Sequence, residues 1–482
     1  MLLLMRRAFA VVVGLVSTVT IAHLVSPREF GLANMSAVIL SFAQIFRDFG
    51  LTNAVLRKGT ISQAEMSFIF WFNAATTTAL CLLIALVSPF AGAFYHEPLV
   101  PWVILASLIG FLLSGLALQH RAMMNRELRF AELAWIDSAA ILLGFLTTLV
   151  LAIIWHDVWS IVIGTIVQSA SGSLLFVIRS GWRPNRPAVH DEIRDLLQFG
   201  ANTSIFSISV FLSQNAAPII IGHALGPWSL GQFNRAQALF TIPTVNVIQP
   251  ITQATMPLMA RLRAVPEEYR KAYLGLVSRI CTILMPASVV LTFGATALVE
   301  VLLGQRWAAA GQVLAALSPA LAAIGLGYSI GDLFATQNRS AELRTLGLIE
   351  MALRLGCLSL AVRYGLLAAA IGFSVTASVV ALLRLLVAGR TGPVSTADQF
   401  RAAAPGLAPA IGAAIAIILF MSAAHGLPRS IWLSLEIITG GIGALAGALP
   451  FAASRLALLD VASAFGLPQL IARARRHRAV QL

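Results

Sequence analysis

Charged residues are scarce in this chain. Only 11% of its 482 residues are Asp, Glu, Lys or Arg, whereas 58% are hydrophobic. Charged residues make up about a quarter of an average soluble domain. A soluble core of this size would leave many of these apolar side chains in water. The composition therefore excludes a soluble globular protein and indicates a chain that crosses a membrane several times.

Cysteine is also scarce. Cys81, Cys281 and Cys357 each fall within an apolar run, and no two of them are close enough in sequence to suggest a metal or disulfide motif. We interpret them as small buried hydrophobic residues. The sequence predicts no metal site, no cofactor and no catalytic residues, and hence no enzymatic activity.

Lysine appears only as Lys58 and Lys271, yet the formal net charge is +13 because arginine is frequent. In a soluble protein this excess of positive charge would suggest nucleic-acid binding. Here the arginines lie mostly in short segments between apolar runs, as the positive-inside rule requires of membrane proteins. We therefore predict no nucleic-acid partner and expect the lipid bilayer to be the main surrounding.

Long apolar runs dominate the sequence. Each is near the roughly 20 residues that a transmembrane helix needs, without the alternation of a membrane β-barrel. The runs predict an all-α polytopic membrane protein with about fourteen transmembrane helices, at residues 8–25, 30–46, 67–90, 99–119, 133–154, 158–178, 199–222, 230–258, 273–303, 309–333, 345–362, 365–388, 404–423 and 430–450.

Basic residues are divided unequally between the two sides of the membrane. The connections on one side contain only Arg28, Arg306, Arg363 and Arg429, and those on the other side contain most of the remaining arginines and both lysines. Because cytoplasmic loops carry the excess of positive charge, this asymmetry predicts that both termini are cytoplasmic.

One stretch of the chain occurs twice, without a gap. Residues 21–34 read IAHLVSPREFGLAN and residues 221–234 read IGHALGPWSLGQFN, with the same Ile, His, Pro, Gly and Asn columns. In each copy we expect the proline to end one helix and the glycine to free the backbone for a turn. The copies lie six spans apart, so the two halves cross the membrane in the same direction. This predicts two parallel six-helix bundles, with any substrate site between them near the midplane.

The repeat and the charged segments suggest a division of the chain. A segment with mixed charge and two prolines separates the two bundles and is the natural hinge. The predicted parts are an N-terminal lobe at 1–180, a cytoplasmic hinge at 181–195, a C-terminal lobe at 196–390, two accessory helices at 391–450 and a basic cytoplasmic tail at 451–482.

Polar residues crowd the predicted helix at 230–258. Asn234, Gln237 and Gln249 lie on it, with three prolines at seven-residue spacing that begin at Pro243. Prolines bend a helix and free carbonyl groups, which is tolerable in a membrane only beside protein or water. We interpret this helix as the wall of a water-filled cavity. Close helix packing through small polar groups is the alternative.

Charged residues within apolar runs are candidates for function because each one is costly at mid-membrane. Arg235, about one and a half turns inside its predicted helix, could present its guanidinium to a phosphate. The alternative is that its side chain extends to the outer interface. Arg47, at the inner end of the second predicted helix, is interpreted only as an interfacial anchor.

Several acids also fall within apolar runs. Glu350 and Arg354 are four residues apart, acid first, so they can form an ion pair on one helix face. Asp332 and Asp137 lie within the predicted tenth and fifth helices. We treat Arg354 as a candidate substrate-binding residue and Asp332, Glu350 and Asp137 as candidates for binding a coupling ion such as a proton. A structural ion pair or an interfacial position is the alternative for each acid.

Four stretches of the chain carry a resemblance to a known family. They are LVSPREFG at 24–31 followed by FRDFGL at 46–51, FNRAQAL at 233–239 followed by MP at 256–257, LGQRW at 303–307, and ATQNR at 335–339. In these residues the chain resembles the polysaccharide transport family, the flippases of the multidrug/oligosaccharidyl-lipid/polysaccharide exporter superfamily. Beyond about residue 345 only the hydropathy is similar. The family's amphipathic segment before the first span is missing here, so we expect the natural start to lie upstream.

The resemblance implies two six-helix lobes in a V with two accessory helices, which alternate between inward and outward openings. It implies a flippase of the bacterial inner membrane that moves a lipid-linked oligosaccharide, typically on undecaprenyl diphosphate, for lipopolysaccharide or exopolysaccharide synthesis. Arg235 matches the family's Asn-Arg-Ala stretch and would meet the diphosphate. A polysaccharide polymerase and a chain-length regulator are candidate partners.

Two alternatives stay open at this point. A drug or lipid-precursor exporter of the same superfamily would have the same architecture. A membrane-embedded polysaccharide polymerase would need a large periplasmic loop with clustered His or Arg, whereas the longest predicted outer loop has only about ten residues.

Overall fold

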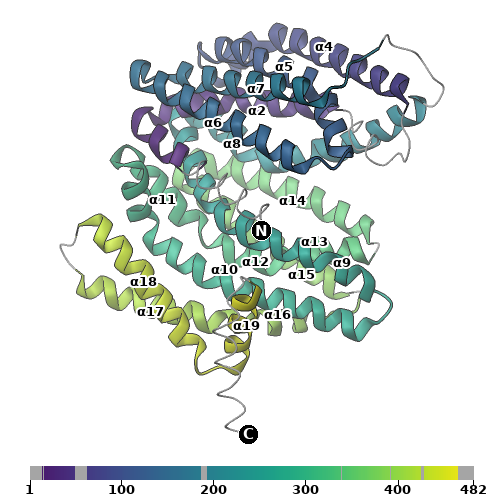
Figure 1. Ribbon diagram of the computed structural model, residues 1–482. Helices are drawn as coiled ribbons and strands as arrows, with labels where there is room; N and C mark the ends of the chain where they lie inside the picture. Colours follow the sequence, from purple (N-terminus) through teal and green to yellow (C-terminus); the bar gives the residue numbers. More distant parts are fainter. Residues whose placement is uncertain are drawn as a thin grey trace. The chain divides into compact units, whose positions relative to one another are not determined.

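A computed structural model of the chain describes residues 14, 16–48, 62–185, 193–337, 339–390, 392–424 and 428–464. The side chains of residues 193–210 are not described. In these ranges every regular element is a helix (Figure 1). The chain forms two compact units, residues 1–234 and 235–482. The predicted hinge at 181–195 lies partly outside the described residues and stays a prediction.

The first unit contains six labelled helices. They are α2 (Pro27–Asp48), α4 (Gln63–Tyr95), α5 (Val100–Arg126), α6 (Phe130–Trp155), α7 (Val158–Ser180) and α8 (Ile193–Pro243), whose last residues belong to the second unit. The backbone of α8 breaks at Gly226, with φ 76° and ψ −178°.

The second unit continues with helices of very different length, of which α10 is the longest among those described. They are α9 (Gln249–Leu262), α10 (Pro266–Leu303), α11 (Ala308–Leu317), α12 (Ala320–Gly327), α13 (Ile330–Thr336), α14 (Ser340–Ala361), α15 (Leu366–Arg390), α16 (Thr396–Ala403), α17 (Leu407–Ala423), α18 (Arg429–Ala448) and α19 (Ala452–Ala464). The helix α19 occupies the start of the segment predicted as a basic tail.

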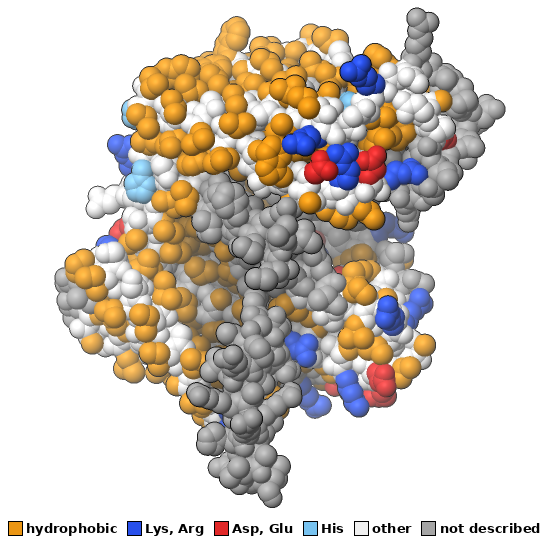
Figure 2. All heavy atoms as spheres, in the orientation of Figure 1, with side chains coloured by type: hydrophobic (Ala, Val, Ile, Leu, Met, Phe, Trp, Pro, Cys, Tyr) orange, Lys and Arg blue, Asp and Glu red, His pale blue; other side chains and the backbone are white. Residues whose placement is uncertain are grey.

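Apolar side chains cover the outside of the described helices. Leu82, Leu86 and Phe90, at four-residue spacing on one face of α4, are 69%, 74% and 73% exposed. Orange side chains spread widely over the face seen in Figure 2. A contiguous apolar surface of this kind is stable against lipid and unstable in water. The fold is therefore that of a multi-pass membrane protein, as the composition predicts.

Ten described helices are long and apolar enough to cross a membrane. The segments Gln305–Leu317 and Ala320–Thr336 form one further span, bent by 44°, if they are counted together. The structure thus divides the predicted tenth helix into α11, α12 and α13. The total of fourteen spans stays a prediction.

The proline-rich helix is irregular where its sequence predicts a bend. A π-helical turn at Thr244–Ile248 directly follows Pro243 and separates α8 from α9. Proline lacks the N–H that a regular helix needs, and a π-turn is one way to accommodate the lost bond. The structure therefore places the irregularity at the first of the three prolines.

The two copies of the repeat pack directly against each other within the first unit. Gly31 on α2 lies against the backbone of Pro227, and Gly231 on α8 lies against the backbone of Pro27. A methyl group on either glycine would overlap the carbonyl oxygen of the opposite proline. Each proline begins the second helix of its copy.

The expected role of the repeated glycines is wrong. Both lie inside helices, at Gly31 in α2 and Gly231 in α8, and neither has the positive φ that a freed turn requires. The turn at the second copy is made instead by Gly226. The glycines are required because a hydrogen in place of a side chain permits the close approach of two backbones.

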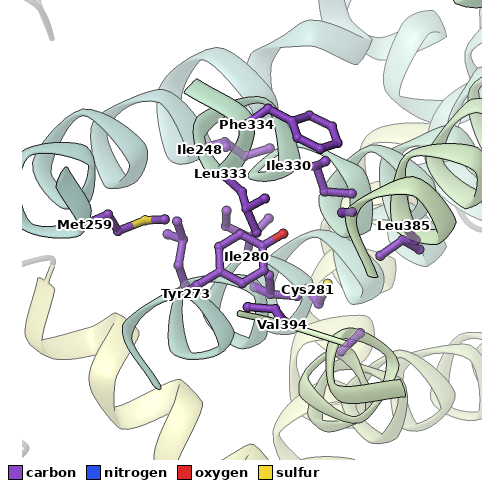
Figure 3. Packing of buried hydrophobic residues seen from close by; sticks show 14 of the residues in the cluster. Ile248, Met259, Tyr273, Ile280, Cys281, Ile330, Leu333, Phe334, Leu385 and Val394 are labelled. Carbon is purple, nitrogen blue, oxygen red and sulfur yellow. The ribbon is translucent and has the colours of Figure 1, made fainter. Parts of the chain in front are cut away.

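The core of the second unit surrounds α10. Tyr269, Tyr273, Ile280 and Leu284 along this helix are almost completely buried, and they meet residues of α9, α13 and α15 (Figure 3). The hydroxyl of Tyr273 donates to Oε1 of buried Gln399 at 3.2 Å. Buried tyrosines of this kind keep a polar end satisfied inside an otherwise apolar core.

We predict that Gly31→Ala destabilises the protein by about 1–3 kcal/mol, because the added methyl group has to displace the backbone at Pro227. Gly275→Ala is the matched control, since Gly275 also lies inside a helix but has open space around its Cα. This control should be neutral or stabilising. The free energy of unfolding, measured by titration with SDS, checks both. Equal stability of the two variants would contradict the close contact.

Candidate functional site

The predicted substrate-binding residues Asn234, Arg235 and Gln237 lie together on the last part of α8. All three side chains are partly buried. The helix begins again at Pro227, earlier than the sequence predicts, so Arg235 is about two turns or 12 Å inside it. This added depth makes extension of the Arg235 side chain to the outer interface more difficult.

Gln249 does not join these three residues. It lies at the start of α9, beyond the π-helical turn, about 20 Å from Arg235 along the helical path. Its side chain hydrogen-bonds Tyr328. The predicted polar helix therefore contributes to two separate places.

The second of these places surrounds Asp332 on α13. Tyr269, Tyr273 and Tyr328 lie close enough to interact electrostatically with its carboxylate. The Oδ2 atom of Asp332 is buried and has no hydrogen-bond partner among the described residues. No described Arg, Lys or His forms an ion pair with Asp332 either. A buried carboxylate without a counter-charge is costly unless it binds a proton or a cation.

The tyrosines beside Asp332 have other partners for their hydroxyl groups. Tyr269 and Thr336 exchange a hydrogen bond of 2.7 Å, and Thr336 also donates to the carbonyl oxygen of Asp332 at 2.8 Å. The hydroxyl of Tyr273 donates to Oε1 of Gln399. Sequence reasoning missed Tyr269 and Tyr273 because they come from the first two turns of α10, which are distant from Asp332 in sequence.

Glu350 and Arg354 form the ion pair that their spacing suggests, with 2.9 Å between Oε1 and the guanidinium. Arg384 on α15 completes the group, at 2.5 Å from Oε2 of Glu350. The Arg354 guanidinium also lies over the ring of Phe373, 5.0 Å from its centre. Two arginines and one carboxylate leave a net positive charge. Sequence reasoning did not include Arg384, although its position in an apolar run could have identified it as a candidate functional residue.

Asp137 lies in a separate polar cavity of the first unit. It accepts a hydrogen bond of 3.0 Å from Arg121, and both side chains are partly exposed. The cavity has a volume of about 370 Å³ and is lined by residues of α2, α5, α6 and α7, among them Gln168.

Arg47, which the sequence suggests as an interfacial anchor, has polar contacts within the first unit. Its guanidinium lines this same cavity and donates to Oγ of Ser114 at 2.8 Å and to the carbonyl oxygen of Phe111 at 3.3 Å. It also lies over the Phe111 ring, 4.8 Å from the ring centre. The residue ends its helix, as the sequence predicts, but the adjacent helix α5 draws the side chain inward.

No group of three or more His, Cys, Asp or Glu among the described residues is arranged to hold a metal ion. The chemistry that the described side chains offer is that of anion binding by arginine and proton or cation binding by isolated carboxylates.

Comparison with known proteins identifies the family. The model of the polysaccharide biosynthesis protein family matches residues 20–312, more than half of the chain. The chain belongs to the polysaccharide biosynthesis protein family. The match covers both copies of the repeat and all of α2 to α10.

Several curated proteins are similar to this family member. The lipopolysaccharide biosynthesis protein WzxC of Escherichia coli is 28% identical over 66% of this chain and 64% of its own length. The teichuronic acid biosynthesis protein TuaB of Bacillus subtilis is 24% identical, and the match covers 58% of each chain. The succinoglycan biosynthesis transport protein ExoT of Rhizobium meliloti is 22% identical over 62% of this chain and 60% of its own length. The chain thus spans about three fifths of the relatives' length.

Solved structures share the fold of this family member. The lipid II flippase MurJ, in an inward closed conformation, has a TM-score of 0.71 over 93% of this chain and 98% of its own, at 14% identity. A multidrug resistance transporter of the MATE family has a TM-score of 0.60 over 81% and 94%, at 16% identity. The chain therefore shares the overall fold of these two solved transporters.

We predict that Glu350→Gln lowers the free energy of unfolding by about 3 kcal/mol, because Arg354 and Arg384 would keep their charges without the carboxylate between them. Glu342→Gln on the same helix is the control, since the carboxylate of Glu342 is partly exposed and has a single arginine, Arg339, as its ion-pair partner among the described residues, so its loss should cost less. Titration with SDS in mixed micelles measures both. A loss in the control as large as that in Glu350→Gln would contradict the prediction.

Proposed function

We propose that this protein is a flippase for a lipid-linked oligosaccharide, carried on undecaprenyl diphosphate, in the bacterial inner membrane. It moves the repeat unit from the cytoplasmic to the periplasmic leaflet by alternating access, with both termini in the cytoplasm. The observation that carries the proposal is family membership over residues 20–312, together with relatives named for polysaccharide synthesis and transport. Transport of this kind needs no catalytic residue, so the proposal includes no enzymatic activity.

Arg235 is the residue we assign to the diphosphate group. A guanidinium presents several N–H donors in a plane and binds two phosphate oxygens at once. Asn234 and Gln237, which lie beside it on α8, are proposed to hydrogen-bond the head group. Gln249 and the positive group around Arg354 are proposed as further contacts along the path of the sugar.

Among the three acids, we propose Asp332 as the residue that binds the coupling proton. Its support is the absence of a counter-charge in the described part of the second unit, which leaves protonation as the means to neutralise it. Asp137 and Glu350 are already paired with arginines. We propose that Asp137 and Glu350 bind a coupling proton only in conformations of the protein in which these ion pairs are broken. A polymerase and a chain-length regulator are proposed partners downstream.

The exporter alternative has one specific observation in its favour, which is the likeness to a multidrug transporter fold. Deletion of the gene distinguishes the two. The flippase proposal expects undecaprenyl-linked oligosaccharide to accumulate on the cytoplasmic side and surface polysaccharide to be lost. Unchanged surface polysaccharide with increased drug sensitivity would favour the exporter.

We predict that Arg235→Ala abolishes export of surface polysaccharide while the protein remains folded and inserted. Arg235→Lys should retain part of the activity, because the charge remains but two-point binding of phosphate is lost. Arg306→Ala, at an exposed arginine, should export normally. Complementation of the deletion strain, with protein levels measured in membranes, tests all three. Normal export by Arg235→Ala would remove Arg235 from the site.

We also predict that Asp332→Asn removes the stimulation of transport by a pH gradient, because the amide keeps the shape of the carboxyl but cannot exchange a proton. Reconstituted protein would be assayed for transfer of lipid-linked oligosaccharide with and without an imposed gradient. Glu342→Gln serves as a control that removes an exposed carboxylate. A gradient response in Asp332→Asn equal to that of the natural protein would exclude Asp332 as the coupling residue.

A further inference from the structure

A second isolated carboxylate lies in the accessory helices. Glu436 on α18 has an exposed fraction of 0%, and neither Oε1 nor Oε2 has a hydrogen-bond partner among the described residues. It is seven residues into the helix, about 10 Å from the first residue, Arg429. The sequence interpretation does not include this residue, and the transport proposal does not use it.

The carboxyl group of Glu436 is closely packed by residues of the neighbouring helices. Its carboxyl group lies against Gly294 of α10, where even a methyl group would collide with Oε2. One turn further along α18, Gly440 packs closely against the side chains of Val290 and Ile417. The carboxyl therefore lies in a narrow apolar notch between α10, α17 and α18, with no room for a larger residue at position 294.

Nearby polar groups on α10 are directed elsewhere. The hydroxyl of Thr292 donates to the carbonyl oxygen of Ser288 at 2.7 Å, and that of Ser288 donates to the carbonyl oxygen of Ser318 at 2.9 Å. Neither hydroxyl donates to the Glu436 carboxylate. An ionised group here would lack both the donors and the water that normally stabilise it.

No described cation faces Glu436 from the elements that pack against α18, which are α10, α17 and α19. On α10, Glu300 is bound to Arg429 at 3.0 Å, and Arg279 is about 22 Å from Gly294 along the helix. The helix α17 has no charged residue. On α19, Arg455 is exposed, and the side chain of Asp460 lies outside the described residues. The ionised form therefore has no counter-charge in the described surroundings.

We propose that Glu436 is a proton-binding site, which holds its proton in the folded protein and in that neutral form allows α18 to pack against α10. A neutral carboxyl group fits the notch without a counter-charge, whereas the ionised group requires water or a cation. Loss of the proton therefore separates α18 from α10. The docking of the accessory pair α17–α18 thus depends on pH. This inference does not rest on the identity of the transported substrate.

The test compares the pH dependence of stability in the natural protein and in Glu436→Gln. Glutamine has the shape of the protonated side chain and cannot titrate. The folded state keeps a proton that the unfolded state releases above the ordinary titration range of glutamate. In that pH range, the ratio of folded to unfolded natural protein should fall about tenfold per pH unit. The ratio for Glu436→Gln, measured under the same conditions, is the reference. Unfolding by SDS between pH 5 and 8 measures this ratio.

Glu300→Gln is the matched control, because it removes a paired acid from the same interface. It should keep the pH dependence of the natural protein. Identical pH dependence in the natural protein and Glu436→Gln would overturn the proposal. Failure of Glu436→Gln to fold at neutral pH would also overturn the proposal. Glutamine would then not replace the protonated glutamate side chain of the natural protein.

A second comparison tests the notch. Gly294→Ala should destabilise the natural protein but have little effect in a Glu436→Ala background, where the colliding carboxyl is gone. Additive effects of the two substitutions would place the carboxyl away from Gly294 and would contradict the geometry on which the proposal stands.

Discussion

Backbone hydrogen bonding in lipid is the constraint on which this structure depends. Water is absent from the membrane interior, so the described spans are helices and their association relies on close packing. Glycine makes this packing possible at several contacts. Gly412 of α17 lies against the backbone of Gly443 of α18, and Gly447 lies against that of Ala408. The same principle brings the two copies of the repeat together at Gly31 and Gly231. Deviations from regular helix occur at prolines and at Gly226.

Charged side chains within this apolar framework fall into two classes. The group of Glu350, Arg354 and Arg384 is compensated internally and retains one positive charge. Asp332 and Glu436 each have buried oxygen atoms without a partner among the described residues. A compensated group can hold its charge permanently and attract an anion. An uncompensated carboxyl is stable when it is protonated, so it responds to pH. The two classes lie on different helices: α14 and α15 hold the compensated group, whereas α13 and α18 hold the isolated carboxyl groups.

Much of the fold could be predicted from sequence because lipid imposes a simple rule on composition. The apolar runs locate most described helices to within a few residues, and the spacing of Glu350 and Arg354 predicts their contact. Side-chain direction and long-range packing could not be predicted in this way. Arg47 turns into a cavity because of a serine on another helix, and Asp332 meets tyrosines from α10. Glu436 could have been suspected as an acid in an apolar run, but its isolation depends on three helices that pack together only in the folded protein.

The reciprocal contact between Pro27 and Gly231, and between Gly31 and Pro227, has an evolutionary consequence. After a duplication, the two copies of a segment are ordinarily free to diverge, since each serves its own half. Here each copy packs against the other. A side chain larger than hydrogen at the glycine of one copy would therefore collide with the proline backbone of the other copy. The two positions are therefore selected jointly. Within one chain, the two contacts have the reciprocity of an interface between the subunits of a symmetric dimer.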